Sequence, residues 1–265
     1  REETFRTPYE IDPFCVPIDQ KTGLLLEVNR RLLKHPGIRK AFSHMFFSRV
    51  ERLFMSTEGS VLSSEVVTSS VGYEAVAVGE NDAQSREYAP PPLTKGYENI
   101  DADDLLANTE RVAQEALAKL QAEELDEGYR DIVVDGHNLA LTIHESVGHA
   151  TELDRALGME ESLAGRTFAT PEKLHRLQYG SSIVNLVADN TLPHGLATQG
   201  FDDEGVADSG GSSCGRASSW AIAPAGRWRA SSAWSGAPAP AAPTIGAASP
   251  LSASPISSSC LAPPP

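Results

Sequence analysis

Two histidines flank a glutamate in "IHESVGHATELD", residues 143–154. Imidazole nitrogens bind Zn²⁺ in proteins, and a nearby carboxylate can take a proton from water that the ion has acidified. His144 and His149 are five positions apart, whereas the histidines of the common H-E-x-x-H helix are four apart and share one face. On an ideal α-helix, five positions turn the second ring about 140° away from the first. A regular helix would therefore keep the two rings from a single ion.

A local widening of the helix would change this conclusion. An i→i+5 turn, the π-turn, would return both rings to one face, and such turns are frequent at functional sites. Gly148 lies inside the interval, where a backbone distortion has little steric cost. The segment can therefore chelate a metal if the helix is widened. Otherwise His144 and His149 are an interior histidine and a surface histidine, and the spacing alone leaves both interpretations open.

Acidic side chains follow the second histidine. Glu152 lies three positions after His149. A carboxylate there could orient a metal-binding imidazole by accepting the N–H of its other ring nitrogen. The alternative for Glu152 is a solvated acidic turn paired with Arg155, and the sequence favours neither. For Asp154 it favours the solvated turn.

Other candidate ligands are weaker. The acidic run before Gly205 lacks the alternating oxygen ligands of a calcium loop, so it predicts a turn: Asp202, Asp203 and Glu204. Three histidines have no partner at ligand spacing and are expected to be structural or exposed: His137, His175 and His194. Cys15 is expected to be a packed or exposed thiol.

The segments before the motif predict a mixed fold. Residues 21–37, "KTGLLLEVNRRLLKHPG", have leucines at helical spacing and end in Pro36 and Gly37, which predicts a helix. Residues 42–60 and 61–81 alternate and favour strands, with "TEGS" as the turn between them. Three consecutive prolines make residues 88–100 an irregular loop. These patterns predict two or three antiparallel strands beside a helix.

A second helix should precede the motif. Residues 102–125 carry an apolar stripe at helical spacing, formed by Leu105, Val112, Ala116 and Leu120. "DIVVDGHNLALTI", residues 131–143, is expected to be a short buried strand and a turn at Gly136 that lead into the motif. The predicted fold class is α+β, with antiparallel strands, a long amphipathic helix and a metal-motif helix, followed by a low-complexity tail.

Charge and composition restrict the function classes. The formal net charge of −14 argues against nucleic acid and against an anionic membrane surface. No apolar run is long enough to span a membrane, and no secretory leader is visible. Three irregularly spaced cysteines do not form a disulfide framework, so a reducing, cytoplasmic compartment is expected.

The composition changes abruptly near Val206. Of the last 59 residues, 44 are Ala, Ser, Gly or Pro, and the only acid among them is Asp208. Such a segment buries too little apolar surface to offset its ordering entropy, so residues 207–265 are expected to be mostly disordered. A shifted reading frame near codon 206 or a decayed gene would explain the change, and a genuine disordered tail is the alternative.

The motif and its surroundings resemble the TldD/PmbA family of metallopeptidases. The resemblance lies in "HESVGHATELDR", "LGMEESLAGRTF" and "ADNTLPHGL" leading to "DDEGV", and it extends upstream through "EIDPF", "STEGS" and "TKGYE". It covers essentially all of residues 1–206. The H-E-x-x-x-H pattern points to the TldD-like branch, because the PmbA-like partner typically lacks it.

The resemblance implies a function and a site. It implies zinc held by His144 and His149, with Glu145 as the general base in hydrolysis of peptides or unfolded polypeptides. It also implies a PmbA-like paralogous subunit or a homodimer as partner. The family takes a third ligand, a cysteine, from a C-terminal domain beyond "DDEGV". Cys214 and Cys260 match no family motif and are not assigned that role.

The expected domains follow from these observations. Residues 1–128 would be the N-terminal α+β region, incomplete at its start; residues 129–206 would be the metallopeptidase region; and residues 207–265 would be the tail. Because a catalytic zinc site generally has three protein ligands, we expect impaired activity in this chain. The alternatives are a non-catalytic subunit that binds peptides or the partner, and a decayed gene product.

Overall fold

The computed structural model describes residues 1–173, 176–180, 184–188, 192–207 and 212–216. Within these residues the chain divides into two compact units. The sheet unit contains residues 6–52 and 64–127. The motif unit contains residues 1–5, 53–63 and the described residues from Gly128 onward.

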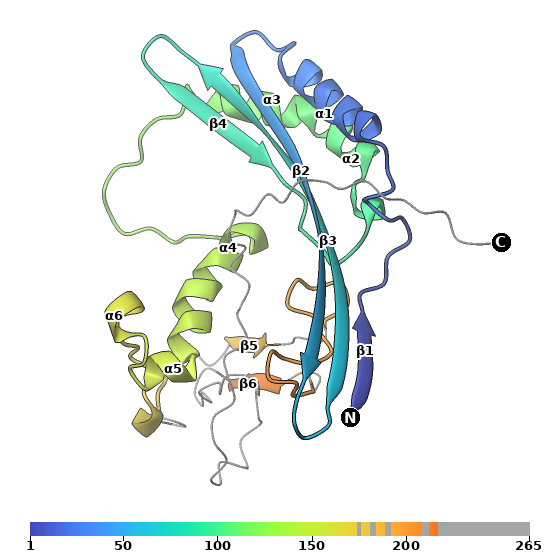
Figure 1. Cartoon of the computed structure of the whole chain (residues 1–265). Helices are drawn as coiled ribbons and strands as arrows, with labels where there is room; N and C mark the ends of the chain where they lie inside the picture. Colours follow the sequence, from blue (N-terminus) through green and yellow to red (C-terminus); the bar gives the residue numbers. More distant parts are fainter. Residues whose placement is uncertain (174–175, 181–183, 189–191, 208–211, 217–265) are drawn as a thin grey trace, which may run out of the picture. The chain divides into compact units, whose positions relative to one another are not determined.

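Four strands form the main sheet (Figure 1): β1 (Glu2–Arg6), β2 (Ile38–Met55), β3 (Val61–Val78) and β4 (Ala83–Tyr88). The hydrogen-bonded order is β1-β3-β2, and β4 also pairs with β3. The antiparallel register of β3 and β4 runs from Tyr73 opposite Tyr88 to Val78 opposite Ala83. Between β2 and β3, Gly59 adopts a φ of 86° and donates its N–H to the Ser56 carbonyl. The strands predicted over residues 42–60 and 61–81 and the turn between them are confirmed, but the sheet has four strands and not the expected two or three.

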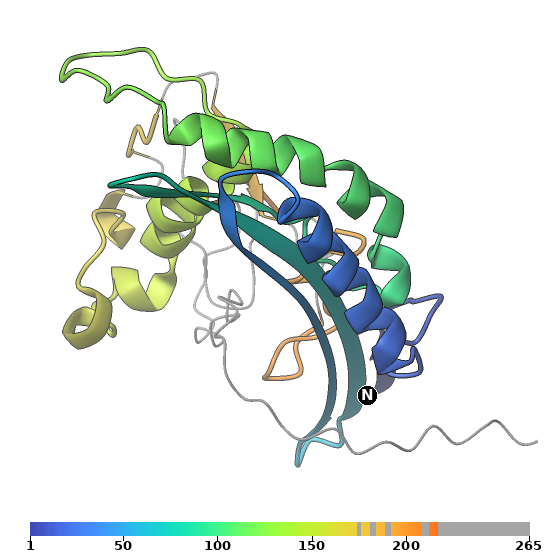
Figure 2. The same ribbon diagram turned by 90° about the horizontal axis from the view of Figure 1, so that it is seen from above.

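Helices cover one face of the sheet (Figures 1 and 2): α1 (Ile18–Leu32), the 3-10 turn η1 (Tyr97–Asn99), α2 (Ala102–Ala107) and α3 (Thr109–Lys119). Helix α1 ends at Leu32, shortly before Pro36, as predicted. The single helix expected over residues 102–125 is wrong in its extent, because it is divided at Asn108 and ends at Lys119. The Asn108 side-chain amide donates to the Asp104 carbonyl at 2.9 Å. Such a bond from an asparagine side chain to the backbone competes with the regular hydrogen bonds of a helix.

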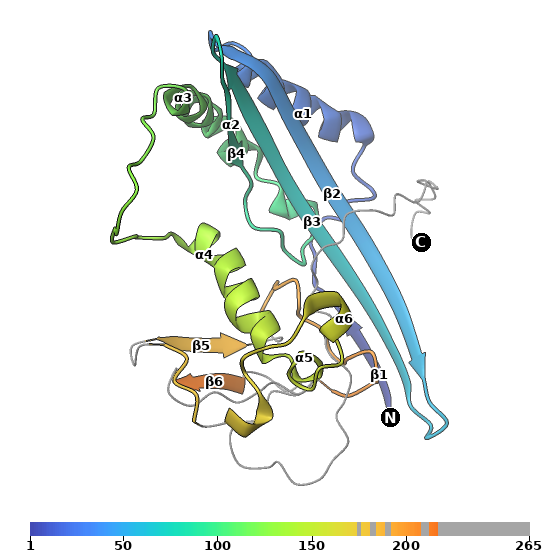
Figure 3. The same ribbon diagram turned by 90° about the vertical axis from the view of Figure 1, so that its left-hand side faces the viewer.

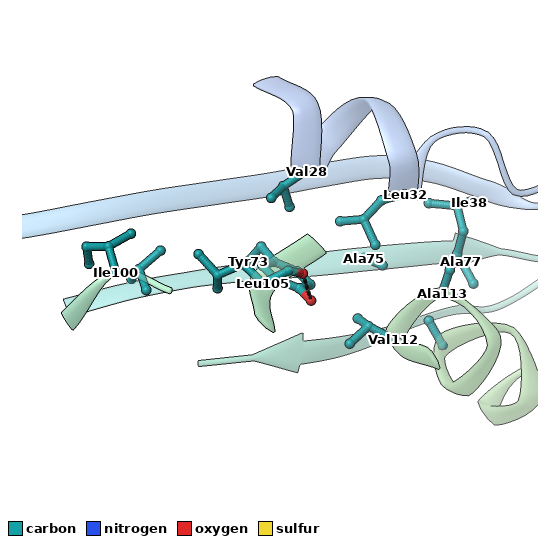
Figure 4. Close-up of a cluster of buried hydrophobic side chains, with 12 residues drawn as sticks. Val28, Leu32, Ile38, Tyr73, Ala75, Ala77, Ile100, Leu105, Val112 and Ala113 are labelled. Carbon is teal, nitrogen blue, oxygen red and sulfur yellow. Dashed lines mark hydrogen bonds between the residues drawn. The ribbon is translucent and has the colours of Figure 1, made fainter. Parts of the chain in front are cut away.

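The core of the sheet unit lies between these helices and the sheet. Val28 and Leu32 from α1 and Val112 and Ala113 from α3 are at most 1% exposed (Figure 4). Tyr73 on β3 is also buried, and its phenol donates to the Leu105 carbonyl at 2.9 Å. The predicted apolar stripe is confirmed, since three of its members are fully buried and the fourth packs against the cluster: Leu105, Val112, Ala116 and Leu120.

The motif unit contains the remaining elements (Figure 3). They are α4 (Gly136–Ile143), the π-helical turn η2 (His144–Gly148), the 3-10 turn η3 (His149–Thr151), α5 (Leu153–Ala156), α6 (Glu161–Ala164), the 3-10 turn η4 (Pro171–Lys173), β5 (Asn185–Ala188) and β6 (Ser212–Arg216). Strands β5 and β6 pair antiparallel.

The buried strand expected at residues 131–134 is wrong. The segment has no strand, and Ile132 and Val133 are 79% and 100% exposed. The turn expected at Gly136 is also wrong, because helix α4 begins at this residue. Asp135 explains this start, since its carboxylate accepts the Asn138 N–H at 2.8 Å and so caps the helix.

Most of the predicted tail lies outside the described residues, which include only Ala207 and Ser212–Arg216 of it. The latter form β6. The strand β6 is an exception to the disorder expected for the tail. For the rest of the tail the expected disorder stays a prediction, as do the domain limits, and Cys260 lies outside the described residues. The α+β class is confirmed by the sheet and the helices. Among the described residues, none of the helices has the length and apolar character needed to cross a membrane.

Candidate metal centre

The backbone between the two histidines is widened into a π-turn. The His149 N–H donates to the His144 carbonyl, five residues back, instead of to the residue four back. Buried Thr151 supports this turn, because its hydroxyl lies 2.8 Å from the Val147 carbonyl oxygen and 3.1 Å from that of Gly148. The predicted widening is confirmed. The expected contribution of Gly148 is not needed, since its φ of −54° is open to any residue.

The π-turn brings the two imidazoles together. Their ring centroids are 4.3 Å apart, with an angle of 73° between the ring planes. The potential ligand atoms of His144, Glu145 and His149 all lie within 4.8 Å of one another. The side chains of His144 and His149 are 25% and 23% exposed, whereas that of Glu145 is 63% exposed. Two half-buried rings and one accessible carboxylate thus form one group at the end of α4.

This donor set fits a divalent transition metal. Zinc takes imidazole nitrogens at about 2.0–2.1 Å, so two such nitrogens on one ion are at most about 4.2 Å apart. The spread of the ligand atoms is close to this scale, and small side-chain rotations would bring them together. Borderline metals such as zinc bind imidazole well, whereas calcium and magnesium prefer oxygen ligands. The described residues therefore suit zinc better than a hard cation.

Glu152 contacts the second imidazole through its Nδ1 atom. Its Oε1 lies 3.0 Å from Nδ1 of His149, and its side chain is 19% exposed. With Nδ1 protonated, this contact leaves Nε2 as the nitrogen with a free lone pair. The geometry is the one expected of a carboxylate that orients a metal ligand. The alternative pairing is also present, because Arg155 Nη2 lies 3.8 Å from Glu152 Oε2.

A second acidic group surrounds Arg155. Ligand atoms of Glu152, Asp154 and Glu160 lie within 4.8 Å of one another. Arg155 forms an ion pair with Glu160 at 2.9 Å, and Asp154 accepts the backbone N–H of Arg155 at 2.8 Å. The guanidinium thus balances part of the negative charge. Asp154 lies in a turn, as predicted, but it is half-buried and not solvated.

The remaining sequence candidates lie elsewhere. Asp202 accepts the backbone N–H groups of Glu204 and Val206 at 3.0 and 2.8 Å, and Gly205 has a φ of 76°, so the predicted turn is confirmed. His137 is exposed on α4, and His194 is half-buried with a φ of 63°. Cys15 is exposed, as one of the two expected alternatives. His175 lies outside the described residues.

Sequence reasoning missed two groups that support the site. Thr151 holds the π-turn through a hydroxyl bond to a carbonyl three or four residues back, a contact that threonine makes readily in helices. Its position four residues after Val147, in a segment expected to be helical, was the available signal. Glu160 was missed because it reaches Arg155 through a turn at Gly158, whose φ is 80°.

The comparisons with known proteins concern both parts of the chain. Residues 11–122 match the PmbA/TldA metallopeptidase central domain. A metalloprotease of Methanocaldococcus jannaschii is 26% identical over 199 residues, which cover 74% of this chain and 41% of that protein. A metalloprotease of Methanothermobacter thermautotrophicus is 28% identical over 155 residues, which cover 58% of this chain and 32% of that protein.

Solved structures share the fold. A structure from Thermotoga maritima superposes with a TM-score of 0.61 and 16% identity, over 80% of this chain and 46% of that one. A structure from Bacteroides thetaiotaomicron gives a TM-score of 0.68 and 15% identity, over 83% of this chain and 47% of that one. Each is described as a candidate modulator of DNA gyrase.

The chain spans less than half the length of these relatives and solved structures. The match to the family model ends before His144, so the roles of the motif residues rest on the geometry of the metal group and on the quoted sequence motifs. The central-domain match and the archaeal metalloproteases agree with each other, and together they identify residues 11–122 as a central domain of the PmbA/TldD metallopeptidase family.

Proposed function

We propose that this chain carries part of a zinc-dependent site for hydrolysis of peptides or unfolded polypeptides. The observation that carries the proposal is the π-turn, which gathers His144, Glu145 and His149 into one group. His144 and His149 would hold the ion, which supplies a Lewis acid and lowers the pKa of water. Glu145, the most exposed of the three, would accept the proton of the attacking water.

The number of imidazoles sets an expectation for the isolated chain. A catalytic zinc site generally has three protein ligands and an open position. The metal group among the described residues offers two imidazoles and Glu145. If Glu145 acts as the base, a third ligand is required from elsewhere. We therefore expect weak zinc binding and low peptidase activity from this chain alone.

A second candidate function is favoured by the same observation, that the metal group offers only two imidazoles and one carboxylate. If Glu145 fills the third ligand position, no carboxylate of the group remains to act as the base. The chain would then be a non-catalytic subunit that binds peptides or its partner, with a structural metal. This candidate predicts bound metal without cleavage of any peptide.

Glu145→Gln separates the two candidates. Under the peptidase proposal, the variant keeps zinc affinity and loses peptide cleavage by about 100-fold or more, because general acid–base catalysis contributes that much. Under the structural-metal candidate, the variant loses zinc affinity and there is no cleavage to lose. Zinc affinity is measured by competition with a chromophoric chelator, and cleavage by mass spectrometry of an unfolded substrate.

Histidine variants test the metal site itself. His144→Asn and His149→Asn should each abolish zinc binding, whereas His137→Asn, an exposed histidine outside the group, should leave it unchanged. Equal zinc content in all three variants would refute the site.

The cytoplasmic location expected from the irregular cysteines belongs to the same proposal and is tested by cell fractionation.

A further inference from the structure

Successive contacts connect His149 to three charged side chains that follow it in the sequence. Glu152 Oε1 lies 3.0 Å from His149 Nδ1, and Arg155 Nη2 lies 3.8 Å from the other carboxylate oxygen of Glu152. Arg155 Nε then donates to Glu160 Oε2 at 2.9 Å. The four side chains alternate in type from imidazole to carboxylate to guanidinium to carboxylate.

These side chains are shielded from solvent. Arg155 and Glu152 are 18% and 19% exposed, and Glu160 is 28% exposed. Most other ion pairs in the described residues are more open; in the pair of Arg166 with Glu161, for example, the side chains are 72% and 53% exposed. Charges that are mostly shielded from water are screened less, so the Arg155 contacts should constrain geometry more than a surface pair does.

The backbone after Arg155 brings Glu160 back to it. The Gly158 N–H donates to the Arg155 carbonyl at 3.1 Å, and Gly158 has a φ of 80°. The Met159 N–H donates to the Asp154 carbonyl at 2.9 Å. This turn places Glu160 beside the guanidinium, five residues from Arg155. Arg155 is therefore held by two carboxylates that come from both sides of it along the chain.

We propose that Arg155, held by Glu160, is a positioning residue for the metal group. It fixes Glu152 in the orientation that accepts the Nδ1–H of His149, and so directs Nε2 of His149 to the ion. A carboxylate that accepts the N–H of a ligating imidazole fixes the tautomer and the orientation of the ring. The role in metal binding rests on the proposed function, whereas the effect on His149 exists in the metal-free chain.

The first test is made without metal. Two-bond ¹H–¹⁵N spectra of the metal-free chain, at alkaline pH where imidazole is neutral, report the tautomer of His149. The wild-type chain should show the Nδ1–H form, and Arg155→Gln should show a mixture of both tautomers. Arg166→Gln, which removes the neighbouring exposed ion pair, should leave the His149 signals unchanged. An unchanged His149 tautomer in Arg155→Gln would overturn the proposal.

The second test measures zinc affinity by chelator competition. Arg155→Gln should weaken zinc binding by about 10-fold. This is the lower end of the range of affinity losses seen when a residue that supports a metal ligand is replaced. Arg155→Lys should recover part of the affinity, since it keeps the charge but loses the fork of donors. Glu160→Gln, a milder change that leaves Arg155 in place, should show a smaller loss. Equal affinity in the wild type and all of these variants would overturn the proposal.

A double variant separates positioning from a general loss of structure. If Arg155 acts only through Glu152, the variant with both Arg155→Gln and Glu152→Gln should bind zinc no more weakly than Glu152→Gln alone. Additive losses would contradict the proposed route. If the wild-type chain binds no zinc at all, the proposed function fails, but the tautomer measurement still decides the role of Arg155.

Discussion

The rings of His144 and His149 lie 4.3 Å apart, centroid to centroid, although five positions separate the two residues. An ordinary α-helix would turn them about 140° away from each other. One backbone bond, from the His149 N–H to the His144 carbonyl, replaces the usual helical bond and brings them together. The metal group therefore depends on the backbone conformation of η2 as much as on its side chains.

The hydroxyl of Thr151 should be necessary for this conformation. Thr151→Val keeps the shape of the side chain but removes the donor to the carbonyls of Val147 and Gly148. The loss of one buried hydrogen bond should cost about 1 kcal/mol of unfolding free energy. Zinc affinity should fall as well, because the π-turn would relax towards a regular helix. Calorimetry and chelator competition measure the two effects.

Thr151→Ser is the matched control for this prediction, since it keeps the hydroxyl. It should retain zinc affinity close to that of the wild type. If Thr151→Val and Thr151→Ser bind zinc equally well, the hydroxyl does not support the metal group.

The ion pair of Asp12 and Arg49 should make the stability of the sheet unit depend on pH. Burial raises the pKa of Asp12, but the Arg49 hydrogen bond, the Phe14 N–H and the Arg49 charge lower it by more, so the net pKa lies below the ordinary 3.8. A carboxyl with a lowered folded-state pKa contributes stability above 3.8 and loses it as the pH falls through the folded value.

Asp12→Asn should therefore destabilise the chain by about 1 kcal/mol near neutral pH, and by less in acid. Urea unfolding at about pH 6 and about pH 2.5 measures this difference. Asp126→Asn, which changes an exposed carboxyl, provides the control. A destabilisation by Asp12→Asn that is the same at both pH values would contradict the assignment.

The core between α2, α3 and the sheet should tolerate truncation poorly. Leu105 is fully buried, so Leu105→Ala should lower the unfolding free energy by roughly 2–5 kcal/mol. Leu125 is 80% exposed. Leu125→Ala should change the unfolding free energy by less than about 0.5 kcal/mol. Similar losses from the two variants, measured by urea unfolding, would place the core elsewhere.

The corrected segment before α4 allows a direct test. Val133 is fully exposed in the structure, whereas its apolar neighbours suggested a buried strand. Val133→Asn should therefore change stability by less than about 0.5 kcal/mol. A loss of several kcal/mol in thermal unfolding would support the buried strand instead.

Local patterns were sufficient to predict the main elements of the sheet unit. Alternating residues predicted β2 and β3, and the stripe through Leu105 and Val112 predicted the buried side of α2 and α3. The break at Asn108 was missed, because it depends on a side-chain bond to the Asp104 carbonyl that helical spacing does not reveal. At residues 131–134, apolar β-branched residues predicted a strand, but no partner strand pairs with them among the described residues.

The candidate site was predicted in a similar, incomplete way. The spacing of His144 and His149 required a widened turn if they were to share an ion, and the structure contains that turn. The contact of Glu152 with His149 was one of two alternatives, and the structure contains it together with the Arg155 pairing. The link from Arg155 to Glu160 could not be read from spacing, because it depends on the left-handed backbone conformation of Gly158.

X-ray absorption spectroscopy of the zinc-loaded chain tests the central claim most directly, because it counts the imidazoles around the ion. The π-turn should place two imidazole nitrogens on zinc at about 2.0–2.1 Å. His144→Asn and His149→Asn should each remove one of them, and His137→Asn should remove none. A zinc spectrum without imidazole scattering, or one that the His144 and His149 variants leave unchanged, would contradict the claim that η2 brings both rings to one ion.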